Sequence, residues 1–183
     1  MSISSASDPA DFLRSPWFQP RGSGLYQDSD YATEPSSPLF YFGFGLSYTV
    51  YTIEKELQIS PSGVLKHGTN FTIKALLSSR GPAGKAVVQI YASQVPPTKV
   101  VRYEHTLLCF AKSYLPANAV GVEIIVECKV NDLDTWDVDE GRYVVHSGEY
   151  VIVAAQHAGE LKTSRSTSTT VKVLGDSAWS QSR

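Results

Sequence analysis

The densest group of reactive side chains in this sequence is a short acidic run. It contains Asp132, Asp134, Asp137, Asp139 and Glu140. Such a run suggests calcium binding, but Trp136 stands where a calcium loop requires an oxygen ligand, and the glycine is misplaced. We therefore expect a helical turn or short loop here, followed by a tight hairpin in which Gly141 adopts a positive φ.

A pair of carboxylates within this run also suggests glycoside hydrolysis. A retaining glycosidase needs two carboxyl groups about 5 Å apart, beside a cleft that admits a sugar ring. Asp137 and Glu140 are close enough in sequence to form such a pair. Acidic pairs in hairpins usually just face water, however, and we expect the same of both residues.

The histidines do not have the spacing of a metal site. Short intervals such as H-x-x-x-H bring two imidazoles to one ion. The four histidines here are dispersed over different turns and strands: His67, His105, His146 and His157. We predict no metal site and no cofactor.

The overall composition excludes several classes of protein. Hydrophobic residues make up 42 % and charged residues 19 % of the chain, which argues against disorder throughout. The net charge of -2, without a long basic run, indicates no nucleic-acid partner.

No stretch approaches the ~18 apolar residues of a membrane span, and the N-terminus lacks a secretory signal. As written, the sequence predicts a cytoplasmic protein, or a secreted one if it is a fragment of a longer precursor.

Two features bear on the redox compartment. Cys109 and Cys128 lie in runs that are typical of strands. A disulfide-stapled secreted domain usually carries more cysteines, so we interpret both as small buried thiols, with a cross-strand disulfide as the alternative. The tripeptide Asn70-Phe71-Thr72 fits the N-glycosylation pattern but sits inside an apparent strand, and such tripeptides arise often by chance.

Short strands with a period of two fill the chain after Tyr48. Alternate residues from Phe71 to Leu77 are apolar, and so are alternate residues from Val120 to Val130. About seven such strands are separated by turn residues, and no segment has a helical period. This pattern predicts an all-β fold, namely an antiparallel β-sandwich of the immunoglobulin or fibronectin type III kind.

The sequence divides into four parts. We predict an irregular N-terminal extension at 1–37, a linker at 38–49, the β-sandwich at 50–175 and a disordered tail at 176–183. The extension is rich in Ser, Pro, Asp and Gly. Its scattered aromatic residues, such as Trp17, are interpreted as anchors that pin it to a surface.

The linker, "PLFYFGFGLSYT", is uncharged and aromatic. Gly43 and Gly45 are expected to let the backbone turn where a side chain would clash. Four rings offer large apolar areas, and we take them as candidate ligand-binding residues: Phe40, Phe42, Phe44 and Tyr48. Trp136 is a fifth candidate, although we favour its interpretation as a core anchor.

The linker closely resembles "PLFPFGYGLSYT" of glycoside hydrolase family 3, the β-glucosidases and β-xylosidases. Two further stretches extend the resemblance. "AGKAVVQIYAS" (83–93) is similar to "AGKEVVQLYVS", and residues 132–155 are similar to "DLAFYDEDGRWVVEPGEFTVMVG". In that family the linker joins an α/β sandwich domain to a C-terminal fibronectin type III-like domain. The resemblance, which runs from about Tyr31 to Leu174, implies that this chain corresponds to the C-terminal domain.

The resemblance also implies what this sequence lacks. Family members carry their nucleophilic aspartate in an N-terminal barrel and their acid/base in or near the α/β sandwich. Neither domain is present, so no catalytic residue is carried over and we expect no glycosidase activity from this chain alone. The implied role is that of a non-catalytic accessory domain that packs against, and stabilises, the catalytic domains of a β-glycosidase.

Two alternatives remain open. The chain could act alone, binding or transforming a small apolar ligand in a pocket where the catalytic domains would otherwise pack. The stretch "RYEHTLLCF" departs from the family's "RPVKELKGF" and supplies the candidate catalytic residues for that case: Arg102, Glu104 and His105. The other alternative is a homodimer formed through the aromatic patch.

Overall fold

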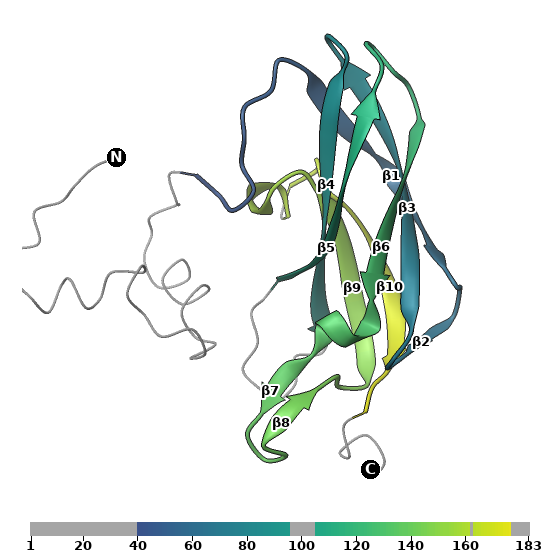
Figure 1. The fold of residues 1–183 in the computed structure, drawn as a ribbon, viewed down its shortest axis with the longest axis vertical. Coiled ribbons are helices and arrows are strands. Elements are labelled where there is room, and N and C mark those ends of the chain that lie inside the picture. The colour runs from purple at the N-terminus through teal and green to yellow at the C-terminus, as the bar shows by residue number, and fades with distance from the viewer. Residues whose placement is uncertain (1–39, 96–104, 162, 177–183) are drawn as a thin grey trace, which may run out of the picture.

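The structure is a computed structural model that describes residues 40–95, 105–161 and 163–176. Within these residues the chain forms ten strands and two short 3-10 helices, and no α-helix occurs there (Figure 1). The strands are β1 (Val50–Ser60), β2 (Val64–Lys66), β3 (Asn70–Arg80), β4 (Gly84–Val95), β5 (Thr106–Leu115), β6 (Val122–Lys129), β7 (Thr135–Asp137), β8 (Arg142–Val144), β9 (Gly148–Ala155) and β10 (Thr167–Leu174). The 3-10 helices are η1 (Val130–Leu133) and η2 (Ala158–Glu160).

Two sheets pack face to face as a sandwich (Figure 1). One has three strands in the order β1-β3-β6, and the other has five in the order β2-β10-β9-β4-β5. The strands β7 and β8 form a separate hairpin. Neighbouring strands of the described chain run antiparallel, except that β2 lies parallel to β10.

This architecture confirms the predicted β-sandwich, but the number of strands is ten instead of seven. The three additional strands, β2, β7 and β8, each have three residues. Such a short strand contains too few alternating positions to produce a recognisable period of two. The seven longer strands are the ones that the alternation predicts.

The core lies between the two sheets. The alternate residues of β3 from Phe71 to Leu77 have exposed fractions of 1 % or less, as their period of two predicts. The corresponding alternation is also confirmed from Ile124 to Cys128 in β6 and on to Val130, the first residue of η1. Val120 is the exception, because it precedes the strand and is 85 % exposed.

The two cysteines form a disulfide, so their interpretation as buried thiols is wrong. Cys109 lies on β5 and Cys128 on β6, and their Cα atoms are 5.5 Å apart. The strands β5 and β6 belong to different sheets and share no backbone ladder. The disulfide therefore joins the two sheets at the margin where β5 and β6 face each other.

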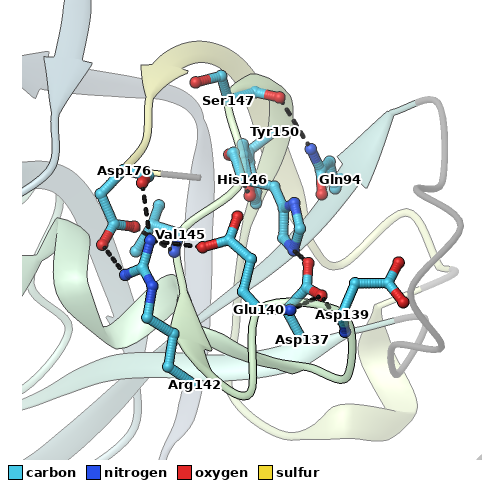
Figure 2. Close-up of polar contacts among 10 residues, drawn as sticks. All are labelled: Gln94, Asp137, Asp139, Glu140, Arg142, Val145, His146, Ser147, Tyr150 and Asp176. Atoms are coloured by element: carbon cyan, nitrogen blue, oxygen red, sulfur yellow. Dashed lines mark hydrogen bonds and ion pairs between the residues drawn. The ribbon is translucent and has the colours of Figure 1, made fainter. Parts of the chain in front are cut away.

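The acidic run forms a turn and a hairpin, as predicted. After η1, the hairpin of β7 and β8 turns at Gly141, whose φ is 62°. One Asp137 carboxylate oxygen accepts hydrogen bonds from the backbone N–H of Asp139 at 2.9 Å and of Glu140 at 3.2 Å. The other oxygen lies 3.5 Å from His146 Nε2 (Figure 2). Asp137 is thus a buried turn cap, so the expectation that it faces water is wrong.

The end of the described chain is attached to this hairpin. Asp176, which we predicted as the first residue of the tail, accepts hydrogen bonds from Arg142 at 2.7 Å and from the Val145 N–H at 2.8 Å (Figure 2). Burial alone raises the pKa of Asp176, but these two hydrogen bonds and the nearby charges of His67 and Arg142 bring it below its usual value. The remainder of the predicted tail, 177–183, lies outside the described residues, as does the predicted extension at 1–37.

Candidate functional site

The two outer faces of the sandwich differ in chemistry. The outer face of the three-stranded sheet carries mostly polar and charged side chains, and Lys74 Nζ there lies 2.9 Å from a Glu123 carboxylate oxygen. The outer face of the five-stranded sheet carries exposed aromatic rings on β5, Phe110 at 65 % and Tyr114 at 61 %. It also carries a small apolar cluster centred on Tyr91. A partner that buries apolar surface would favour the second face.

The linker packs against this second face. The Phe42 carbonyl accepts a hydrogen bond of 2.9 Å from the Ala158 N–H at the start of η2. Gly43 has a φ of 78° and lies directly against the Gln89 side chain of β4, where a Cβ atom would overlap the amide. Gly43 is therefore required as predicted, whereas Gly45 is not, because no atom lies near its Cβ position and its φ is not positive.

Three linker rings gather around His157, which precedes η2. The centroids of Phe40 and Phe44 are 5.5 Å apart. Phe44 meets the His157 ring edge-to-face at 5.3 Å, and Tyr41 stacks on the same imidazole at 6.5 Å. These distances are typical of favourable aromatic pairs, so the rings hold one another in place.

The linker rings and one ring of β5 lie on the same outer face of the five-stranded sheet, near Gln89. Gly43 contacts Gln89, and Gln89 lies directly beside Phe110 in the β4–β5 ladder. The linker rings thus lie close to Gln89, and Gln89 is the direct neighbour of Phe110. We call this surface the aromatic face and define it as Phe40, Phe42, Phe44 and Phe110, whose exposed fractions are 67 %, 65 %, 42 % and 65 %.

Buried polar contacts fix the support beneath the aromatic face. The Gln89 side chain donates to the Gln156 carbonyl at 2.8 Å and accepts from the Tyr91 hydroxyl at 2.5 Å. The Glu160 carboxylate, which is 4 % exposed, accepts from the Gln156 N–H at 2.9 Å and lies 3.8 Å from His157 Nε2. These bonds give η2 and β4 a fixed geometry, so the exposed rings rest on a rigid base.

Burial raises the pKa of the Tyr91 hydroxyl to about 12. The folded state therefore favours the protonated phenol, and the stability that this contributes is complete below about pH 10 and is lost as the pH rises towards about 12. We expect the wild type to lose roughly 1 kcal/mol more than Tyr91→Phe between about pH 9 and about pH 11. Urea unfolding of both proteins at the two pH values checks this, and equal losses would contradict it.

The structure places the candidate ligand-binding residues of the linker in different surroundings. The structure brings Phe40 and Phe44 into contact and places Phe42 beside them on the linker. Tyr48 is 98 % exposed and lies beyond them, where the chain enters β1. The pocket that would make any of them ligand-binding residues stays a prediction.

Trp136 is not a core anchor. It lies on β7, is 49 % exposed, and meets Tyr143 of β8 edge-to-face at 5.3 Å. Figure 1 places its hairpin at the end of the sandwich opposite the linker. Trp136 and the aromatic face are therefore separate features.

The candidate catalytic residues stay untested. Arg102 and Glu104 lie outside the described residues, and His105 lies just before β5. Among residues 40–95, 105–161 and 163–176, no group of three His, Cys, Asp or Glu side chains is arranged to hold a metal ion. No helix in that part of the chain is long and apolar enough to cross a membrane.

Comparison with known proteins identifies the domain. Residues 86–158 match the fibronectin type III-like domain family. The chain carries a fibronectin type III-like domain. Probable β-glucosidase I of Emericella nidulans is 38 % identical to it over 130 residues, which is 64 % of this chain and 15 % of that protein. A β-glucosidase of Rhizobium radiobacter is 33 % identical over 132 residues, which is 72 % of this chain and 16 % of that protein.

Solved structures give the same result for the fold. β-Glucosidase 3B of Thermotoga neapolitana, solved with α-D-glucose, matches with a TM-score of 0.65 and 25 % identity, over 83 % of this chain and 20 % of that chain. A GH3 β-glucosidase of Bifidobacterium adolescentis matches with a TM-score of 0.66 and 22 % identity, over 83 % of this chain and 21 % of that chain. The resemblance of the fibronectin type III-like domain to the C-terminal portion of family 3 β-glucosidases is therefore confirmed. The chain spans about 15 % of the length of these curated relatives.

The sequence did not predict that Phe110 belongs to the aromatic face or that His157 contacts the linker rings. Phe110 entered only as part of the stretch "RYEHTLLCF", and His157 only as one of four dispersed histidines. A signal for Phe110 does exist, because Phe110, Lys112 and Tyr114 alternate along β5 as a solvent-facing row. The contact of His157 with the linker joins residues more than a hundred positions apart, which no local pattern reveals.

Proposed function

We propose that this fibronectin type III-like domain is a non-catalytic accessory domain that packs through its aromatic face against the catalytic part of a β-glucosidase. The observation that carries the proposal is the exposure of four phenylalanine rings on a rigid base. Large apolar side chains that gather exposed on one face are typical of protein interfaces. The relatives that carry the matching domain are named as β-glucosidases, and in them it forms a small part of a longer chain.

The position of the linker supports the same surface. Phe40, the first described residue, belongs to the aromatic face. In the family that the linker resembles, the α/β sandwich domain precedes this segment. A domain attached at this end of the linker begins beside the aromatic face. The short connection therefore keeps that domain close to the surface on which it would bury apolar rings.

The energies involved are sufficient for stable packing. Burying one large apolar side chain contributes roughly 1.5 to 3 kcal/mol. The rings are also held in position before the partner arrives, because Gly43 lies against Gln89 and Phe44 against His157. Little conformational entropy is then lost on packing.

A chimaera tests the proposal. In it, the matching domain of the Emericella nidulans relative is replaced by this domain with its linker, and the half-life of β-glucosidase activity on heating is measured. We expect Phe110→Asp to shorten that half-life at least tenfold, because it places a charge in the buried interface. Ile125→Asp is the matched control, since Ile125 is 54 % exposed on the outer face of β6, in the other sheet.

Equal half-lives for the two variants would contradict the proposal. Light scattering on the isolated chain distinguishes the homodimer alternative. Two results together would favour the homodimer. In the isolated chain, the wild type would self-associate and Phe110→Asp would abolish the association; in the chimaera, Phe110→Asp would leave the half-life unchanged. The aromatic face would then bind a second copy of the chain instead of a catalytic partner.

A further inference from the structure

The Asn70 side chain of the tripeptide Asn70-Phe71-Thr72 is exposed in the folded chain. It is the first residue of β3 and is exposed, whereas Phe71 is 1 % exposed and points into the core. Because successive side chains of a strand point to opposite faces, the Asn70 side chain lies on the outer face of the three-stranded sheet. The strand position that seemed to argue against modification therefore presents the acceptor amide to solvent.

The surroundings of Asn70 suit a large polar group. Its direct neighbour in the β3–β6 ladder is Lys129, which is exposed. The other end of β3, at Arg80, pairs with Val50 of β1, the strand that follows the linker. Asn70 is thus at the end of the sandwich remote from the linker and on the sheet opposite the aromatic face. A bulky substituent there leaves the aromatic face clear.

The disulfide is a second, independent observation. Structural disulfides form and persist in oxidising compartments and are rare in the cytosol. The bond between Cys109 and Cys128 therefore indicates a chain that folds in such a compartment. In eukaryotic cells this is also the compartment in which asparagine residues of N-x-T tripeptides are glycosylated.

We propose that Asn70 carries an N-linked glycan, acquired when the chain passes through the secretory pathway. The donor is an oligosaccharide attached to a lipid pyrophosphate. In the transfer, a bond forms between Asn70 Nδ2 and the sugar C1 atom while the bond between C1 and the pyrophosphate oxygen breaks. The lipid pyrophosphate leaves with the electron pair of that bond, and the proton lost from Nδ2 is taken up by water.

The fold also fixes when the transfer takes place. In the folded chain, Asn70 is paired with Lys129 of β6, and Thr72 is paired with both Glu127 of β6 and Ser60 of β1. A transferase must surround the tripeptide, which these two ladders prevent. The glycan is therefore added before β3 pairs, and the folded sheet then accommodates it because the side chain points outward.

Mass spectrometry of the protein from the cells that naturally make it tests the proposal. The peptide containing Asn70 is analysed before and after treatment with an amidase that releases N-glycans in heavy-oxygen water. We expect a peptide that carries a hexosamine core before treatment. After treatment it should contain an oxygen-labelled aspartate at position 70.

Two substitutions expressed in the same cells provide matched controls. Thr72→Ser keeps the acceptor pattern and should keep the glycan, whereas Thr72→Ala removes the pattern and should remove the glycan completely. Both retain Asn70 itself. An unmodified Asn70 peptide in the native protein, or a modification that survives Thr72→Ala, would overturn the proposal. Neither outcome bears on the aromatic face, which lies on the other sheet.

Discussion

Replacing Cys109 and Cys128 together by alanine is expected to lower the free energy of unfolding by about 3 kcal/mol. The disulfide closes a loop whose ends are 19 positions apart in sequence, and it restricts the unfolded chain accordingly. It also joins two sheets that share no backbone hydrogen bonds at that margin. Urea unfolding of the oxidised wild type and of the double variant, followed by circular dichroism, measures the difference.

The reduced wild type separates the effect of the bond from that of packing. Its thiols still fill the space between β5 and β6, so it should lose most of the same free energy if the covalent link is responsible. A reduced protein as stable as the oxidised one would contradict the prediction. A double variant much less stable than the reduced wild type would instead assign the effect to lost packing.

The second large effect is expected at the cap of the β7–β8 hairpin. Asp137→Ala should cost about 2 to 3 kcal/mol, because it leaves two partly buried N–H groups without their acceptor and removes the partner of His146. Asp137 and His146 are both buried, with exposed fractions of 5 % and 8 %. The measurement is the free energy of unfolding together with hydrogen exchange of the amides of Asp139 and Glu140.

Asp137→Asn is the matched control for this cap. Its side-chain oxygen still accepts hydrogen bonds from the turn, so the two amides should remain protected and the cost should fall to about 1 kcal/mol. If the alanine and asparagine variants lose the same stability, the capping hydrogen bonds are not the cause. Fast exchange throughout the chain in the alanine variant would show a global effect in place of a local one.

Much of the fold follows from the sequence because sheets impose a simple pattern. One buried face per strand forces alternation, and this predicts β3 and β6 almost residue by residue. The disulfide was only the alternative interpretation because the pairing of Cys109 with Cys128 depends on how one sheet is placed over the other. That placement is set by packing between strands distant in sequence, and periodicity within each strand contains no information about it.

The candidate site was predicted in part for a similar reason. The linker rings stand together in sequence, and their lack of charge indicates an interface wherever they lie. The contribution of Phe110 depends on the β4–β5 ladder, which places it beside Gln89 and hence beside Gly43. Trp136 shows the opposite error, because a large ring in a strand suggests a core position, yet its hairpin lies outside the sandwich.

The disulfide gives the sandwich two unlike margins. At one margin β5 and β6 are joined covalently, whereas at the other a groove of about 350 Å³ lies between β1, β2 and β10, lined in part by Leu57, Val64 and Val171. Local opening should therefore start at this second margin, where water reaches the backbone of β1 and the part of β10 that β2 does not cover, before Lys172. That open margin is also where a foreign strand would add. The bulge in β1 between Ile53 and Leu57, which carries three charged residues, makes such an addition unfavourable along β1.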